Sequence, residues 1–140
     1  MLQNFKNGVL FASYVGHANP TSWTHNGLLR WPDIENEFFY SHPPFVFTGT
    51  CEFTRWDSPT VSGGEVLFLN SRGGFIGLLT GSRVTSISGN GDLCRAVGAE
   101  TFKPLPNGEM PRLGDIVMNA KNNYWYTHSR YSSTLTKNTE

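Results

Sequence analysis

Residues 14–17, Tyr-Val-Gly-His, and residues 48–53, Thr-Gly-Thr-Cys-Glu-Phe, are the stretches that decide the fold of this chain. Each closes an apolar run with the character of a buried strand, so His17 and Cys51 stand at corresponding ends of two predicted parallel strands. Open α/β sheets place their chemistry at the carboxyl ends of their strands. The two stretches therefore predict a site built on a histidine and a cysteine.

Three apolar runs predict the strands of a parallel sheet. Residues 9–15 and 45–50 are nearly continuous apolar runs, which is the pattern of strands buried on both faces. Residues 75–79 form a third run, and Ser82 and Arg83 follow it. Right-handed crossovers keep the ends of such strands on one side of the sheet, so we expect these polar residues to join His17 and Cys51 there.

Helices and connections are predicted between and after the strands. Gly8 is placed to end a first helix in a left-handed conformation, and a chain that begins with the tail of a helix indicates a cut chain. Pro32 suits the first position of a helix that should end near Tyr40. Ser62 and Glu65 have the spacing of a capping box. The predicted helices cover residues 2–7, 32–40, 61–69, 92–100 and 113–120, with a surface loop over 18–29 and a proline-rich connection over 103–111.

The composition is that of a soluble globular domain. The chain has 140 residues, and its 11 lysines and arginines balance its 11 aspartates and glutamates, so nothing favours a nucleic-acid or anionic-membrane surface. Its apolar stretches are far shorter than the ~20 residues of a membrane span, and we expect a soluble fragment. A sheet of three strands is thin, which suggests missing strands. We expect one domain over residues 1–121 and a polar C-terminal tail over 122–140, disordered or cut from its neighbour.

The two cysteines are too few for a disulfide framework, so we expect thiols at Cys51 and Cys94. A cysteine nucleophile attacks as a thiolate and needs a nearby base, commonly a histidine. Cys51 would form the acyl-enzyme, while His17 would position the carbonyl and protonate the departing amine. The backbone amides of Ala18 and Cys51 are the predicted oxyanion donors.

Simpler interpretations remain open. A lone cysteine is often a small buried hydrophobe, and Cys94 lies among apolar residues of a predicted helix, where a core role is favoured. His25, His42 and His128 are interpreted as loop or surface residues. The chain lacks the paired spacings of a zinc site, so we predict no metal and no cofactor. Aromatic and charged residues near the presumed site either wall a substrate groove or pack; the groove candidates are Trp23, Trp56 and Arg83.

Several segments, in order, resemble the gingipain-type cysteine peptidases. The resemblance lies in residues 15–17, 48–57, 62–65 and 73–80, and it covers most of residues 8–120. It implies a caspase-like α/β fold, here part of a three-layer sandwich with a mostly parallel sheet, and a dyad of His17 and Cys51. One residue departs from the family: the usual glycine after the catalytic histidine is Ala18, whose side chain narrows the site.

Within that family, the chain is most similar to the sortases of the type IX secretion system. This resemblance implies a cysteine endopeptidase and transpeptidase at the bacterial cell surface or outer membrane. Its polypeptide substrates would be the C-terminal secretion signals of exported proteins, its acceptor an anionic lipopolysaccharide, and its partners other secretion components. Whole members are far longer, so the chain would supply part of the catalytic subdomain. The alternative is a non-catalytic binding module that keeps the fold and holds a partner with the aromatic loop over residues 19–31.

Overall fold

The computed structural model describes the backbone of residues 1–137 and the side chains of residues 1–128. The chain divides into two compact units, residues 1–90 and residues 91–140. The first unit holds both stretches that carry the predicted site. Among the described helices, none is both long enough and apolar enough to span a membrane.

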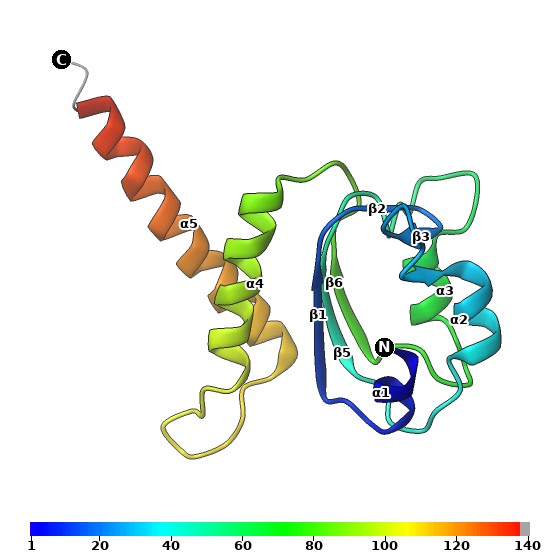
Figure 1. Ribbon diagram of the computed structural model, residues 1–140. Coiled ribbons are helices and arrows are strands. Elements are labelled where there is room, and N and C mark those ends of the chain that lie inside the picture. Colours follow the sequence, from blue (N-terminus) through cyan, green and yellow to red (C-terminus); the bar gives the residue numbers. More distant parts are fainter. Residues whose placement is uncertain (138–140) are drawn as a thin grey trace. The chain divides into compact units, whose positions relative to one another are not determined.

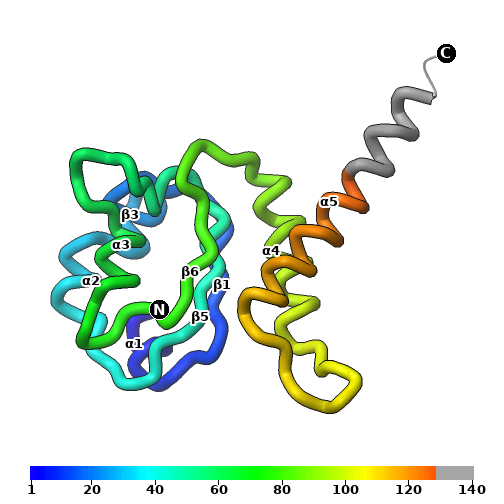
Figure 2. The backbone as a smooth tube through the Cα atoms, turned by 180° about the vertical axis from the view of Figure 1, so that it is seen from behind, coloured from blue at the N-terminus to red at the C-terminus, as the bar shows by residue number. Residues whose placement is uncertain are grey.

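The first unit is built on a three-stranded parallel sheet in the order β1-β5-β6. Its strands are β1 (Phe11–Val15), β5 (Phe45–Gly49) and β6 (Gly77–Thr80). They lie side by side in both views, with their carboxyl ends at the same edge (Figures 1 and 2). The parallel sheet confirms the predicted α/β fold class.

The burial of the strands follows their order in the sheet. Every residue of the central strand β5 is buried. Strand β1 is only partly buried, and two of its residues, Ser13 and Val15, are exposed. The prediction that residues 9–15 are buried on both faces was therefore wrong: in the described part of the chain β1 pairs with β5 alone, at the edge of the sheet, and its apolar composition did not reveal this.

Helices α1 (Leu2–Lys6), α2 (Trp31–Glu37) and α3 (Gly63–Phe68) cover one face of the sheet (Figure 1). Gly8 follows α1 with φ 93°, which confirms the left-handed conformation expected there. Helix α2 ends before the predicted Tyr40, because the Tyr40 amide donates to the Arg72 carbonyl and its hydroxyl donates to the Gly74 carbonyl. The core of this unit comprises Phe5, Trp23, Leu29, Ile34, Phe38, Val46, Phe53, Leu67 and Phe75.

Helix α3 begins at the predicted capping box. The Glu65 carboxylate accepts the backbone N–H of Ser62 at 2.8 Å and its hydroxyl at 2.6 Å. Ser62 is fully buried, so this carboxylate satisfies a donor that water cannot reach. The local signal in the sequence was enough to locate this helix.

The segment predicted as a surface loop over residues 18–29 is a small antiparallel sheet instead. It contains β2 (Ala18–Asn19), β3 (Ser22–Trp23) and β4 (Leu29–Arg30) in the order β2-β3-β4. Trp23 and Leu29 are 2% and 0% exposed. The polar composition concealed these two core residues, which anchor the segment to the first unit.

Helix α4 (Ile87–Thr101) starts within the first unit, and α5 (Leu113–Lys137) follows in the second. Helix α4 begins five residues before the predicted start at Asp92, through a Ser-Gly-Asn-Gly sequence with poor helix propensity. Residues 122–137, for which no period was predicted, continue α5. Residues 138–140 lie outside the described part, and the proposed division at residue 121 stays a prediction.

Candidate active site

The sheet register places the predicted residues at one edge. Val15 pairs with Gly49, and the amide of Gly16 donates to the Gly49 carbonyl at 3.2 Å. His17 and Cys51 each lie two residues beyond this last pair, on neighbouring strand ends. On the other side of β5, the Glu52 amide donates to the Arg83 carbonyl at 3.4 Å. The structure thus brings together the carboxyl ends that the three apolar runs predicted.

Cys51 is a half-buried free thiol. Its sulfur accepts the backbone N–H of Thr85 at 3.4 Å and lies 3.7 Å from the Thr85 carbonyl oxygen and 3.8 Å from the Thr85 hydroxyl. Within the described part of the chain, every hydrogen-bond partner of this sulfur belongs to Thr85. The His17 imidazole is therefore not hydrogen-bonded to it. The sequence held no signal for Thr85, because the contact joins segments 34 residues apart.

The backbone turns sharply after Cys51. Glu52 has φ 54°, a left-handed conformation that a non-glycine residue adopts at a cost of about 1–2 kcal/mol. Gly81 lies against Thr50, the residue before Cys51: a Cβ on Gly81 would come within 2.2 Å of the Thr50 carbonyl oxygen. The turn and the close approach together fix the path of the backbone on both sides of Cys51.

His17 is exposed, and its backbone is well anchored. Its carbonyl accepts the Tyr14 hydroxyl at 3.0 Å and the Thr24 amide at 2.9 Å. Its ring centroid lies 6.5 Å from that of His25, a residue interpreted from the sequence as a simple loop histidine. Ala18, the second predicted oxyanion donor, opens β2 and pairs with Trp23. The predicted roles of His17 and Ala18 stay predictions.

A charged cluster lies beside Cys51 on the loops after β5 and β6. Arg55 pairs with Glu52 at 3.1 Å and approaches Asp57 at 3.6 Å, and Arg83 donates to the Asp57 carboxylate. The hydrogen bond from Arg83 holds the pKa of Asp57 below its usual range, against a smaller opposing effect of desolvation. No local pattern in the sequence indicates this ion pair, because Asp57 and Arg83 are 26 positions apart.

The three groove candidates occupy different surroundings. Trp23 is buried in the core and stacks on Tyr14, with ring centroids 4.6 Å apart, which favours packing over a groove wall. Trp56 is 60% exposed on the loop after Cys51. Arg83 is exposed as well, but Asp57 engages its guanidinium. A groove role for Trp56 and Arg83 stays a prediction.

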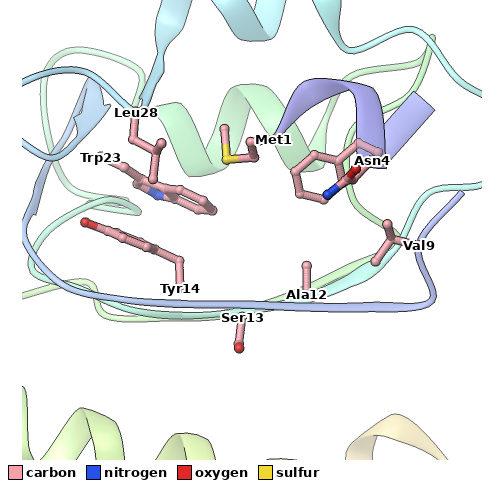
Figure 3. A pocket seen from close by; sticks show the side chains of 9 residues that line it. Met1, Asn4, Val9, Ala12, Ser13, Tyr14, Trp23 and Leu28 are labelled. Carbon is pink, nitrogen blue, oxygen red and sulfur yellow. The ribbon is translucent and has the colours of Figure 1, made fainter. Parts of the chain in front are cut away.

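An apolar pocket of about 220 Å³ lies away from the cysteine (Figure 3). Figure 3 shows Ala12 and Tyr14 on one side and Trp23 and Leu28 on the other, while Ser13 points away. Neither His17 nor Cys51 lines this pocket. Its lining is almost entirely apolar and holds no nucleophile paired with a base, so it is not a candidate catalytic centre.

Comparison with known proteins identifies the relatives of this chain. The sequence model of peptidase family C25 matches residues 1–139. The crystal structure of gingipain R, an Arg-specific cysteine proteinase, superimposes with a TM-score of 0.67 at 15% identity, over 88% of this chain and 29% of that one. This likeness confirms the caspase-like fold. The chain spans less than a third of the length of gingipain R. A search of curated proteins found no match.

Proposed function

The chain belongs to peptidase family C25, and on that premise we propose that it carries the nucleophile and the acid–base residue of a cysteine peptidase site. Cys51 is the nucleophile and His17 its partner. The observation that supports this proposal is the register of β1 and β5: His17 and Cys51 each lie two positions beyond the last strand pair, Val15 with Gly49. A cysteine and a histidine 34 positions apart follow neighbouring strand ends here because these two strands are adjacent and parallel.

The chemistry follows from the thiol and the imidazole. The Cys51 thiolate attacks the carbonyl carbon of the substrate, and a thioester forms as the peptide C–N bond breaks. The His17 imidazolium gives its proton to the departing amine. Water or a second amine then resolves the thioester, yielding hydrolysis or transpeptidation. The backbone amides of Cys51 and Ala18 are the donors proposed for the negative oxygen.

The absence of a hydrogen bond between His17 and Cys51 in the described residues is compatible with this role. Catalytic hydrogen bonds are often long before substrate binds and shorten in the substrate complex. His17 is exposed and Cys51 is half-buried, so neither residue is enclosed in the core. The strained backbone of Glu52 beside the nucleophile supports a functional turn, since such strain is concentrated at active sites.

We further propose a sortase-like role in the type IX secretion system. The support is the resemblance of residues 15–17, 48–57, 62–65 and 73–80 to the sortases of that system, such as PorU. The substrates would then be C-terminal secretion signals, the acceptor an anionic lipopolysaccharide and the location the cell surface. Ala18 departs from the family's usual glycine after the catalytic histidine, and its backbone amide can still donate to the negative oxygen.

One observation favours a second candidate, a binding module without catalysis. Among the described residues, the Cys51 sulfur has its hydrogen bonds with Thr85 and none with an imidazole, as expected of a structural thiol. Such a module would hold a partner with the small sheet of β2, β3 and β4. The partner would meet exposed polar residues there, because Trp23 and Leu29 are buried.

The experiment uses the full chain with a fluorogenic polypeptide substrate, in the presence and absence of a competing amine. Cys51→Ala should remove activity entirely, His17→Ala should lower kcat about 10²- to 10⁴-fold, and the control Cys94→Ala should leave it unchanged. Ligated product beside hydrolysed product would support transpeptidation. Cleavage that survives Cys51→Ala would overturn the proposal, and polypeptide binding without any cleavage would favour the binding module.

A further inference from the structure

We propose that Asn90 and Thr85 are positioning residues for the Cys51 thiol. The Asn90 side chain donates a hydrogen bond to the Thr85 hydroxyl, and that hydroxyl donates one to the carbonyl of Thr50, next to Cys51. These two bonds orient the Thr85 amide N–H toward the Cys51 sulfur. This inference rests on the proposed role of Cys51 as nucleophile and extends it to the group that stabilises the thiolate. All of these residues belong to the first unit.

The Thr85 amide is suited to stabilise a thiolate. Its N–H donates to the Cys51 sulfur at 3.4 Å. A thiolate has no proton to donate, so a donor aimed at it favours the charged form over the thiol. When Cys51 loses its proton, its contact with the Thr85 carbonyl at 3.7 Å loses its donor, while the amide contact strengthens. The amide is therefore the contact that distinguishes thiolate from thiol.

The Thr85 side chain fixes the direction of this amide. Its hydroxyl donates to the Thr50 carbonyl at 3.3 Å and accepts the Asn90 side-chain N–H at 2.7 Å. A hydroxyl has a single proton, and here the Thr50 carbonyl receives it, which leaves an oxygen lone pair for Asn90. The loop after β6 is thus tied to the residue that directly precedes the nucleophile. Loss of either bond frees the Thr85 backbone to move away from the sulfur.

Asn90 reaches this position because the central strand ends in a glycine. A Cβ on Gly49 would lie 2.8 Å from the Asn90 Cβ, closer than carbon atoms approach without displacement. Gly49 has no left-handed backbone, so space for Asn90 accounts for the glycine there. Asn90 is itself held in the first turns of α4, where its amide donates to the Ser86 carbonyl at 2.9 Å. Gly49 in β5 thus leaves the space that Asn90 in α4 needs to hydrogen-bond with Thr85.

The test measures the rate at which iodoacetamide alkylates Cys51 across pH in the full chain, by mass spectrometry, with Cys94 as the internal reference. Asn90→Ala and Thr85→Val should slow labelling at pH 7 about threefold to tenfold, the factor that one net hydrogen bond represents. They should also move the half-maximal rate to higher pH. Asn90→Asp should have a larger effect, because its carboxylate cannot donate and its charge opposes the thiolate. Thr85→Ser should be labelled at the wild-type rate, because serine keeps the hydroxyl.

Ser88→Ala is the matched control, since Ser88 lies on the same helix and, among the described side chains, its hydroxyl bonds to that of Ser86. The inference is overturned if Asn90→Ala and Thr85→Val keep the wild-type pH profile, or if Thr85→Ser is as impaired as Thr85→Val. Equal changes at Cys94 would show general loss of structure and would also count against it. Failure of the proposed function gives a different result: Cys51→Ala would leave cleavage intact whatever Asn90 does to labelling.

Discussion

Glu52 shows how a single residue holds the turn beside the nucleophile. Its left-handed backbone is unfavourable for a side chain with a Cβ, yet its carboxylate pairs with Arg55 at 3.1 Å. The side chain of Arg55 is 42% exposed, so this ion pair contributes little to stability. The strain is therefore larger than the ion pair that accompanies it. A functional turn explains its presence better than stability does.

Comparison of Glu52→Gly with Glu52→Ala isolates this strain. Both variants lose the ion pair with Arg55, but only glycine adopts φ 54° without steric cost. We expect Glu52→Gly to be more stable than Glu52→Ala by about 1–2 kcal/mol. Urea unfolding measures the difference. Equal midpoints for the two variants would show that the turn is not strained.

Asp57 gives a pH-dependent prediction at the same scale. Arg83 lowers the pKa of Asp57 in the folded state, so the pair stabilises the fold above the unfolded-state pKa of about 4. The contribution is lost as the pH falls through the lower folded-state value. We expect Asp57→Asn to lower Tm slightly and evenly from pH 6 to 8, and to match the wild type at the acidic end.

High salt is the control for the Asp57 variant. Because both side chains are exposed, 1 M NaCl should screen most of the attraction between Asp57 and Arg83 and shrink the Tm difference at neutral pH. A Tm difference that persists unchanged at the most acidic pH would mean that Asn disturbs the loop for reasons other than charge.

At the scale of elements, Gly64 in α3 and Gly98 in α4 differ in whether the structure has room for a side chain. A Cβ on Gly64 would lie 1.9 Å from the Thr54 hydroxyl oxygen and 3.1 Å from the Phe53 carbonyl oxygen. Gly98 in α4 has nothing within 4 Å of the same position. Helix propensity favours alanine at both sites. Packing against the loop after Cys51 decides the outcome only at Gly64.

Substitution by alanine separates these two effects. Gly64→Ala should destabilise the fold by about 1–3 kcal/mol, because the added methyl group has no room. Gly98→Ala should stabilise α4 by about 0.5–1 kcal/mol, because it restricts the unfolded chain without a clash. Chemical denaturation followed by circular dichroism measures both. A neutral Gly64→Ala would mean that the loop after Cys51 yields easily.

At the scale of the molecule, an aromatic cluster between the sheet and its helices holds the first unit together. Phe38 is fully buried, and its ring centroid lies 5.5 Å from that of Phe5 and 6.0 Å from that of Phe75. These residues come from segments far apart in the sequence. Their contact keeps α1, the end of α2 and the start of the last strand in one core.

Phe38→Ala should therefore cost about 3–5 kcal/mol, a large share of the 5–15 kcal/mol that typically stabilises a domain. The neighbouring Phe39 is the matched control. It is 41% exposed, and Arg72 lies over its ring at 4.0 Å. Phe39→Ala should cost only about 0.5–1 kcal/mol. Similar urea midpoints for the two variants would show that the cluster does not carry the fold.

The elements that could be predicted are those whose signals are local. The capping box of Ser62 and Glu65, the left-handed Gly8 and the buried run of β5 each depend on residues a few positions apart. Helix α4 was predicted too short, because its Ser-Gly-Asn-Gly start has the composition of a turn. The small sheet of β2, β3 and β4 was missed because its two core residues lie among polar neighbours.

By itself, the sequence determined that a histidine and a cysteine follow two strands of a parallel α/β sheet, because apolar runs and glycine placement are properties of short segments. Tertiary structure alone decided that β1 is an edge strand, that Arg83 engages Asp57 and that Thr85 is the neighbour of the Cys51 sulfur. These facts depend on which segments pack side by side. That choice is made by the burial of the whole core, and no local stretch of residues encodes it.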